Sequence, residues 1–240
     1  MNRARFSRIS HTGMRFWNPL DETELLRFLR ELPLADGDRV LDYGCGDGEL
    51  LVELASRHDL RITGIDSNPE AIAVCREKIR GHFLAEPFRV ELFETEVFDL
   101  VVNVGASPGF DLVVEQIKPL VRPGGRTLIG DGYWQGSPAP EYLSFLGASD
   151  SDMRTHEENC DTLIAAGFEL ERTAVSTLAD WDRYEDRYDA NMSAHLKAHP
   201  DDPEHTEFEE RRSRWRAMYL ECGRGTMGFA LYQGLKSLAD

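Results

Sequence analysis

Short apolar runs alternate with amphipathic segments along most of the chain. Runs with the length and composition of buried strands lie at residues 39–41, 62–65, 98–102, 127–130, 168–175 and 226–236. Apolar residues at helical spacing predict helices over residues 49–57, 110–121 and 155–166. Another helix is predicted to begin at Pro69, behind a capping box of Ser67 and Glu70. This alternation is typical of an α/β fold with a doubly wound, mostly parallel sheet.

The two ends of the chain depart from this alternation. Residues 1–20 are irregular and aromatic, and a leucine-rich helix is predicted from Asp21. Residues 179–222 separate the last two strands and hold two helical stretches around a segment containing Pro200 and Pro203. The 240 residues therefore divide into an N-terminal lid and helix (1–35), a core (36–178), a helical cap (179–222) and a final strand (223–240), all within one domain.

A glycine-rich loop carries the candidate chemistry. The sequence Asp-Tyr-Gly-Cys-Gly-Asp-Gly spans residues 42–48, after the first strand and before a helix, and the next strand ends at Asp66. Glycines allow a sharp turn and a close approach of the backbone to a ligand. The Asp66 carboxylate has two oxygens that can accept hydrogen bonds from both hydroxyls of a ribose.

The spacing of this loop separates classes of cofactor. A dinucleotide-binding loop has the pattern G-x-G-x-x-G, but here Glu49 stands at the third glycine position. A carboxylate there would repel a pyrophosphate. A phosphate-binding P-loop is excluded because no G-K-[ST] follows. An acidic loop suits a ligand with a positively charged amino-acid group.

These residues resemble motif I and the following acidic motif of class I S-adenosylmethionine-dependent methyltransferases. Residues 98–102 resemble the fourth strand of that fold, and residues 120–126 resemble the turn into its fifth strand. The resemblance covers residues 36–131 and implies a seven-stranded Rossmann-like sheet, with the helical cap inserted between the last two strands. It also implies S-adenosylmethionine as the cofactor and methyl transfer as the activity.

By this resemblance, one set of residues holds the cofactor. The glycine loop lies at its methionine end, Asp66 at its ribose, and the end of the fourth strand beside both cofactor and substrate. The set comprises Asp42, Gly44, Cys45, Gly46, Gly48, Asp66, Ser67, Asn103 and Gly105. The family also has an acidic residue after the third strand that contacts adenine. Glu94 and Glu96 are the candidates here, although the connection into the next strand is short.

Aromatic residues concentrate outside the predicted core and mark a candidate substrate pocket. On the cap they recur at helical spacing, which suits either a pocket or packing of the cap onto the core. The candidates are Trp17, Tyr133, Trp134, Trp181, Tyr184, Tyr188, Trp215 and Tyr219. Tyr133 and Trp134 are expected just after the fifth strand, at the sheet edge where α/β proteins bind ligands.

No residue is identified as catalytic from the sequence. A general base would help a hydroxyl or ammonium acceptor, and His11, Asp131 and His156 are the candidates nearest the predicted site. The histidines and cysteines lack the spacing of metal ligands, so no metal site is predicted. The four cysteines include no C-x-x-C pair, which is typical of reduced thiols in a cytoplasmic protein.

Charge and hydropathy limit the partners. The net charge of −16 disfavours a nucleic-acid partner, because phosphate binding needs a basic surface. No apolar run is long enough to span a membrane. We therefore expect a small-molecule methyltransferase, monomeric or homodimeric, with the methylated atom (O, N, S or C) undetermined. The alternatives are a protein or RNA methyltransferase and a non-catalytic protein that binds S-adenosylmethionine.

Overall fold

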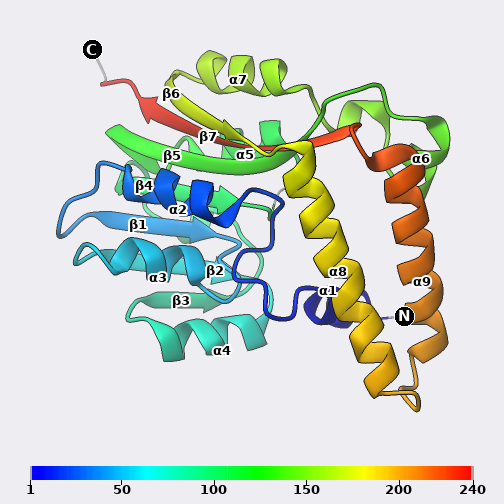
Figure 1. Cartoon of the computed structure of the whole chain (residues 1–240). Coiled ribbons are helices and arrows are strands. Elements are labelled where there is room, and N and C mark those ends of the chain that lie inside the picture. Colours follow the sequence, from blue (N-terminus) through cyan, green and yellow to red (C-terminus); the bar gives the residue numbers. More distant parts are fainter. Residues whose placement is uncertain (1, 107, 239–240) are drawn as a thin grey trace.

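A seven-stranded sheet forms the centre of the molecule, with strand order β3-β2-β1-β4-β5-β7-β6 (Figure 1). The computed structural model describes residues 2–106 and 108–238. β7 runs antiparallel to both of its neighbours, and the other pairs are parallel. The strands are β1 (Arg39–Tyr43), β2 (Arg61–Asp66), β3 (His82–Ala85), β4 (Phe98–Val104), β5 (Val121–Trp134), β6 (Phe168–Val175) and β7 (Met227–Lys236). The predicted mostly parallel α/β sheet is confirmed.

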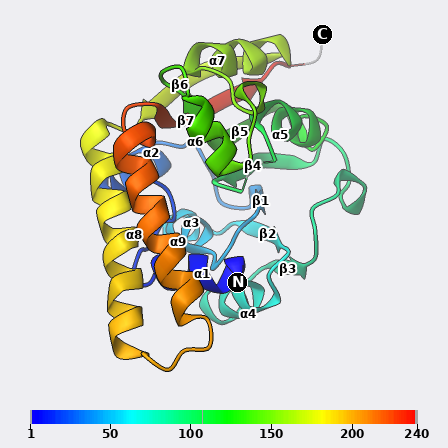
Figure 2. The ribbon, with the colours of Figure 1, turned by 90° about the vertical axis from the view of Figure 1, so that its right-hand side faces the viewer.

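Helices cover both faces of this sheet. Apolar side chains of α2 (Glu22–Arg30), α3 (Glu49–Ala55) and α4 (Pro69–Lys78) pack on one face. Those of α5 (Phe110–Ile117) and α7 (His156–Ala165) pack on the other. Shorter helical segments lie at α6 (Pro140–Leu146), Val90–Leu92, Asp150–Asp152 and Tyr219–Gly223. Because β1 to β5 run parallel, their carboxyl ends meet at one edge of the sheet. Figure 2 views this edge from the side of the cap helices.

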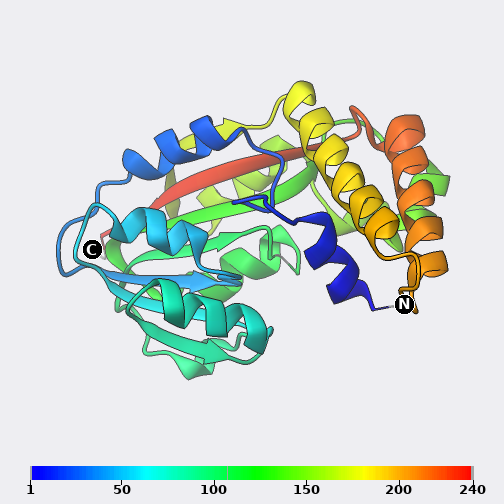
Figure 3. The same ribbon diagram turned by 60° about the horizontal axis from the view of Figure 1, so that its bottom comes forward.

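Two long helices, α8 (Leu178–Ala198) and α9 (His205–Met218), lie between β6 and β7 in the chain, as predicted. They pack with α1 (Arg3–Ser10) beside the carboxyl-terminal edge of the sheet, and we call these three helices the cap unit (Figures 1 and 3). Phe6 of α1 lies between Tyr188 of α8 and Phe208 of α9. Arg5 pairs with Asp202 and Glu204 at the turn between the two long helices. These contacts make α1 part of the cap unit, although it is far from α8 and α9 in the sequence.

The structure corrects several sequence expectations. Residues 3–10 form a helix where an irregular segment was predicted. The fifth strand extends through Trp134, because β7 pairs with it from Arg126 to Trp134. The N-cap of α4 is Asn68, whose Oδ1 accepts hydrogen bonds from the backbone nitrogens of Glu70 and Ala71; Ser67 lies one residue too early. Within residues 2–106 and 108–238, no helix is long and apolar enough to cross a membrane.

Removing the Phe6 ring should loosen α1 from the cap unit. Phe6 is 1% exposed, and burial losses of this size cost about 3–5 kcal/mol. In Phe6→Ala we expect faster amide hydrogen exchange in α1 and the facing part of α8, with the exchange of the sheet unchanged. Leu112→Ala, at a side chain that is 41% exposed, is the control and should change neither. Unchanged exchange in α1 of Phe6→Ala would show that α1 is held by other contacts.

Candidate functional site

The glycine loop between β1 and α3 is a cradle of backbone that side chains would block. Gly44, Gly46 and Gly48 have φ angles of 78°, 50° and 79°, which only glycine adopts without strain. A Cβ on Gly44 would overlap the Cβ of Ala106, in the loop after β4. The loop therefore brings the ends of β1 and β4 into contact.

Asp66, at the end of β2, holds this loop in place. Its Oδ2 accepts a hydrogen bond from the backbone nitrogen of Gly46 at 3.0 Å, and its Oδ1 accepts one from the nitrogen of Asn68 at 2.8 Å. Each carboxylate oxygen can accept a further hydrogen bond. The side chain thus fixes the glycine loop and the start of α4 and still has acceptor capacity toward a ligand.

Asp42 is a buried carboxylate without a partner. It is 1% exposed, and neither of its oxygens has a hydrogen-bond partner. Burial, together with the nearby charge of Asp66, raises its pKa to about 7. Asn103 on β4 is also buried, with its Oδ1 unpartnered, while its Nδ2 donates to the carbonyl oxygens of Tyr43 and Ala106. Unpartnered buried acceptors beside a glycine cradle suit a ligand that carries N–H donors.

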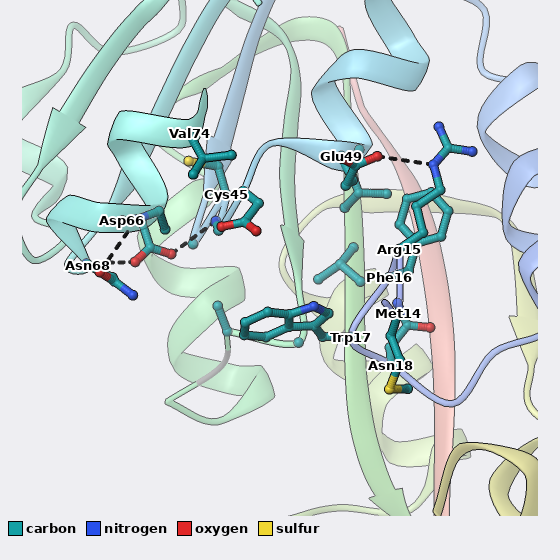
Figure 4. Close-up of a pocket in the computed structure, with 18 of the residues that line it drawn as sticks. Met14, Arg15, Phe16, Trp17, Asn18, Cys45, Glu49, Asp66, Asn68 and Val74 are labelled. Atoms are coloured by element: carbon teal, nitrogen blue, oxygen red, sulfur yellow. Dashed lines mark hydrogen bonds and ion pairs between the residues drawn. The ribbon is translucent and has the colours of Figure 1, made fainter. Parts of the chain in front are cut away.

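A cavity of about 580 Å³ lies against the glycine loop and Asp66 (Figure 4). The core lines it with the glycine loop, the start of α3, parts of α4 and the end of β4. Its other wall is formed by residues 13–18, which we call the strap. Met14, Arg15, Phe16, Trp17 and Asn18 all line the cavity.

Ion pairs fasten the strap to the core. Arg15 Nε donates to Glu49 Oε2 at 3.1 Å, and Arg15 Nη2 donates to Glu53 Oε2 at 3.1 Å, both on α3. Lys78 of α4 pairs with the other carboxylate oxygen of Glu49, Oε1, at 2.7 Å. Arg8 of α1 pairs with Glu70 at the start of α4. The strap is thereby anchored directly after the glycine loop.

Comparisons with known proteins agree with this geometry. A family model for a methyltransferase domain matches residues 34–189. The chain belongs to the class I S-adenosylmethionine-dependent methyltransferases. A methyltransferase from Geobacter sulfurreducens, solved with S-adenosyl-L-homocysteine, is 26% identical with a TM-score of 0.84, covering 97% of this chain and 98% of that one.

Two curated relatives extend the comparison. The uncharacterized protein YjhP of Escherichia coli is 28% identical over 97% of this chain and 98% of its own length. The 27-O-demethylrifamycin SV methyltransferase of Amycolatopsis mediterranei is 26% identical over 81% of this chain and 76% of its own length. The predicted family, enzyme class and cofactor are thus confirmed.

The predicted cofactor residues largely gather at the cavity. Gly44, Cys45, Gly46, Asp66 and Gly105 line it. Asp42, Gly48, Ser67 and Asn103 do not, although Gly48 caps α3 and the unpartnered oxygens of Asp42 and Asn103 lie in the same region. The acidic, glycine-rich wall and the free acceptors fit a cofactor with an ammonium group and a ribose. Asn68 also lines the cavity, and the sequence reasoning missed it.

The first acid after the third strand is Glu86, which was not among the residues predicted to contact adenine. β3 ends at Ala85 and is followed by Glu86, which pairs with Arg89 at 3.1 Å. The predicted candidate Glu96 instead pairs with Lys236, just before β4 begins and so at the opposite edge of the sheet from the cavity. Because β3 has only four residues, its weak pattern hid the position of Glu86.

Of the aromatic residues expected to face substrate, all of which are described, Trp17 lines the cavity and the others do not. Tyr133 and Trp134 are buried in β5, and Trp134 Nε1 donates to the carbonyl oxygen of Asp150. The cap residues have partners inside the cap: Trp215 donates to Glu185, Tyr219 to Asp182, and Tyr188 packs on Phe6. Trp181 and Tyr184 pack edge to face on α8.

The candidate bases already have partners. His11 Nδ1 lies 2.7 Å from the carbonyl oxygen of Ser7, so that nitrogen carries the proton, and Nε2 accepts from the Tyr184 hydroxyl at 2.7 Å. Burial lowers the pKa of His11, which keeps the ring neutral. Its ring stacks on Trp17, with centroids 4.5 Å apart. His11 therefore lies behind the cavity wall.

The other two candidates lie farther along the sheet. His156 contacts the Tyr232 hydroxyl at 3.0 Å, and burial lowers its pKa. Asp131 accepts a hydrogen bond from the backbone nitrogen of Gly132. Neither lines the cavity. No group of three or more potential metal ligands occurs among the residues that the structure describes.

We expect Asp66→Ala to weaken S-adenosylhomocysteine binding by at least about 100-fold. The change removes the anchor of the glycine loop and the acceptors for the ribose, and charge-assisted hydrogen bonds contribute about 1.5–3 kcal/mol each. Glu77→Ala, on the exposed side of α4, is the matched control. Calorimetric titration measures both, and wild-type affinity in Asp66→Ala would contradict the assigned role.

Asp42→Asn should stabilise the apo protein and weaken its binding of the cofactor. Because the folded-state pKa of Asp42 is raised to about 7, the folded protein favours the protonated form, and stability is lost as pH rises from the unfolded value through 7. At pH 8 we expect the apo variant to be roughly 2–4 kcal/mol more stable than wild type in urea unfolding, and less so at pH 5.5. It should also bind S-adenosylhomocysteine more weakly. A pH-independent difference would contradict this account.

Proposed function

We propose that the enzyme transfers the methyl group of S-adenosylmethionine to a small organic molecule. The observation that carries the proposal is the wall that the strap forms along the cavity. A volume of about 580 Å³ is in the range of small-ligand pockets, and one wall is a segment of the chain itself, anchored by Arg15. A folded protein or RNA acceptor would need this wall to open.

The strap and the end of β4 are the proposed acceptor side of the cavity. Met14, Phe16, Trp17 and Val104 give it apolar and aromatic surface. Asn18 adds polarity: its Oδ1 accepts from the backbone nitrogen of Leu20 at 3.1 Å, which orients the amide and leaves its N–H donors for a ligand. An acceptor with an apolar body and one oxygen or nitrogen acceptor matches this surface.

S-adenosylmethionine supplies an electrophilic methyl group when bound. The protein positions and shields the reactants. The glycine loop, Asp42 and Asp66 hold one partner, while the strap holds the other at attack distance, an effect that contributes about 7–11 kcal/mol in favourable cases. The strap, which includes Trp17, covers one side of the site and reduces the access of water to it.

We propose a separate role for each segment of the chain. Residues 1–35 form the lid, 36–178 bind the cofactor, 179–222 cap the site and 223–240 complete the sheet. The Amycolatopsis relative is named for methylation of a small molecule, 27-O-demethylrifamycin SV, which supports the substrate class. The stack of Trp17 on His11, which bonds Tyr184 of α8, supports a cap that stabilises the acceptor wall.

A substrate screen tests the proposal. Release of S-adenosylhomocysteine is measured with a panel of small hydroxyl, carboxyl, thiol and amino compounds, and in parallel with total cellular RNA and a mixed protein extract. We expect turnover with small molecules. Turnover with RNA or protein alone would overturn the assignment, and cofactor binding without turnover on any of them would favour a non-catalytic protein.

With an acceptor from that screen, Trp17→Ala should lower kcat/KM by about 10–100-fold, because an aromatic wall contributes about 1.5–3 kcal/mol of burial. The affinity for S-adenosylhomocysteine should change by less than about three-fold, since the assigned cofactor contacts come from the core. Trp134→Phe, away from the cavity, is the control. Equal losses of cofactor and acceptor binding in Trp17→Ala would place Trp17 at the cofactor.

A further inference from the structure

Two cysteines that the methyl-transfer chemistry does not use meet at the glycine loop. Cys45 lies within the loop and lines the cavity, and Cys75 lies on α4. Both are free thiols, and their interaction shifts the pKa of each. Cys75 Sγ also donates to the carbonyl oxygen of Gly46 at 3.1 Å. Cys45 therefore belongs to the wall of the cofactor cavity, and Cys75 supports the loop from the side of α4.

Two glycines make room for these sulfurs. A Cβ on Gly64 of β2 would lie 2.9 Å from Cys45 Sγ, and one on Gly48 would lie 2.8 Å from Cys75 Sγ. Alanine at either position would push the sulfur away. The thiols thus occupy a compact space bounded by β2, the loop and α4, where a small shift of the loop can join them.

We propose that Cys45 and Cys75 are a redox-modification site, at which a hydroperoxide oxidant forms an intramolecular disulfide that weakens cofactor binding. The cavity gives a small oxidant access to Cys45 when the cofactor is absent. Bound cofactor covers the loop and blocks that access. Whether the two cysteines become oxidised then depends on whether the cofactor is bound.

The chemistry balances without any further co-reactant. The Cys45 sulfur attacks one oxygen of the hydroperoxide, the O–O bond breaks, and a sulfenic acid forms with release of water or an alcohol. The Cys75 thiolate then attacks that sulfur, forming the S–S bond and releasing water. The two thiols lose two electrons and two protons, and the hydroperoxide is reduced. A dithiol reductant reverses the change.

Access, rather than acidity, sets this order, because Cys45 lines the cavity and Cys75 is fully buried. The hydrogen bond with Cys75, together with burial, raises the pKa of the Cys45 thiol, which slows its attack on the oxidant. The same hydrogen bond lowers the pKa of Cys75, which favours it as the thiolate that resolves the sulfenic acid.

The disulfide would act on the loop backbone. Oxidised Cys75 has no proton to donate to the Gly46 carbonyl, and the S–S bond draws Cys45 toward α4. Gly46 is the residue whose nitrogen bonds Asp66, and the nitrogens of Gly44 and Cys45 bond the Ile65 carbonyl. A shift of the loop therefore disturbs the cradle and the Asp66 clamp together.

The test treats the full-length apo enzyme with hydrogen peroxide, with and without saturating S-adenosylhomocysteine. Non-reducing peptide mapping by mass spectrometry looks for a Cys45–Cys75 linkage, and calorimetry measures S-adenosylhomocysteine affinity. We expect the linkage in the apo sample, protection by the ligand, and an affinity at least about ten-fold weaker that dithiothreitol restores.

Variants separate this site from other oxidation. In Cys75→Ser, dimedone should label Cys45 and no linkage should form. Cys160→Ser/Cys222→Ser should respond like wild type. The proposal is overturned if Cys160 and Cys222 oxidise while Cys45 and Cys75 stay unlinked, if the ligand gives no protection, or if the linked protein binds S-adenosylhomocysteine as tightly as the reduced one.

Discussion

The two hydrogen bonds that Asp66 accepts from Gly46 and Asn68 are the interaction on which the site depends. They join the end of β2 to the glycine loop after β1 and to the start of α4. Gly44, Gly46 and Gly48 of this loop have positive φ and no side chain, so the loop has little intrinsic preference for one shape. A single carboxylate at a strand end supplies the shape, and Asn68 then caps α4 with its own side chain. The cofactor cradle is therefore built from backbone held by one acid.

The attachment of the strap determines how the cavity can open. The strap is fastened to α3 through Arg15, and α1, which precedes it, is packed into the cap unit through Phe6. Asn191 of α8 also donates to the carbonyl oxygens of Ser10 and Thr12. The strap is thus attached to the core through Arg15 and to the cap unit through α1 and Asn191. Any movement that opens the cavity must break either the Arg15 ion pairs or the packing of α1.

The core could be predicted from the sequence, because its signals are local. Apolar runs, Gly44–Gly46–Gly48 and Asp66 follow each other at fixed spacing, and each element forms where its own residues favour it. The position of α1 could not, because a short helix with arginine and serine has a weak pattern and is stabilised by α8 and α9, far away in the chain. The aromatic stripes of the cap were similarly ambiguous. Tyr188 and Trp215 proved to pack within it, since the same spacing serves a core or a pocket.

Glu49 contributes both to the choice of cofactor and to the anchoring of the strap over the cavity. Its place at the first turn of α3 disfavours a pyrophosphate and is favourable for an acid at a helix N-terminus. Partial burial opposes its ionisation, but hydrogen bonds from Lys78 and Arg15 hold its pKa below the usual range. The charge that excludes a dinucleotide is therefore also the anchor of the strap. A glycine there would remove the anchor and the repulsion in one step, so cofactor choice and cavity closure are coupled at this position.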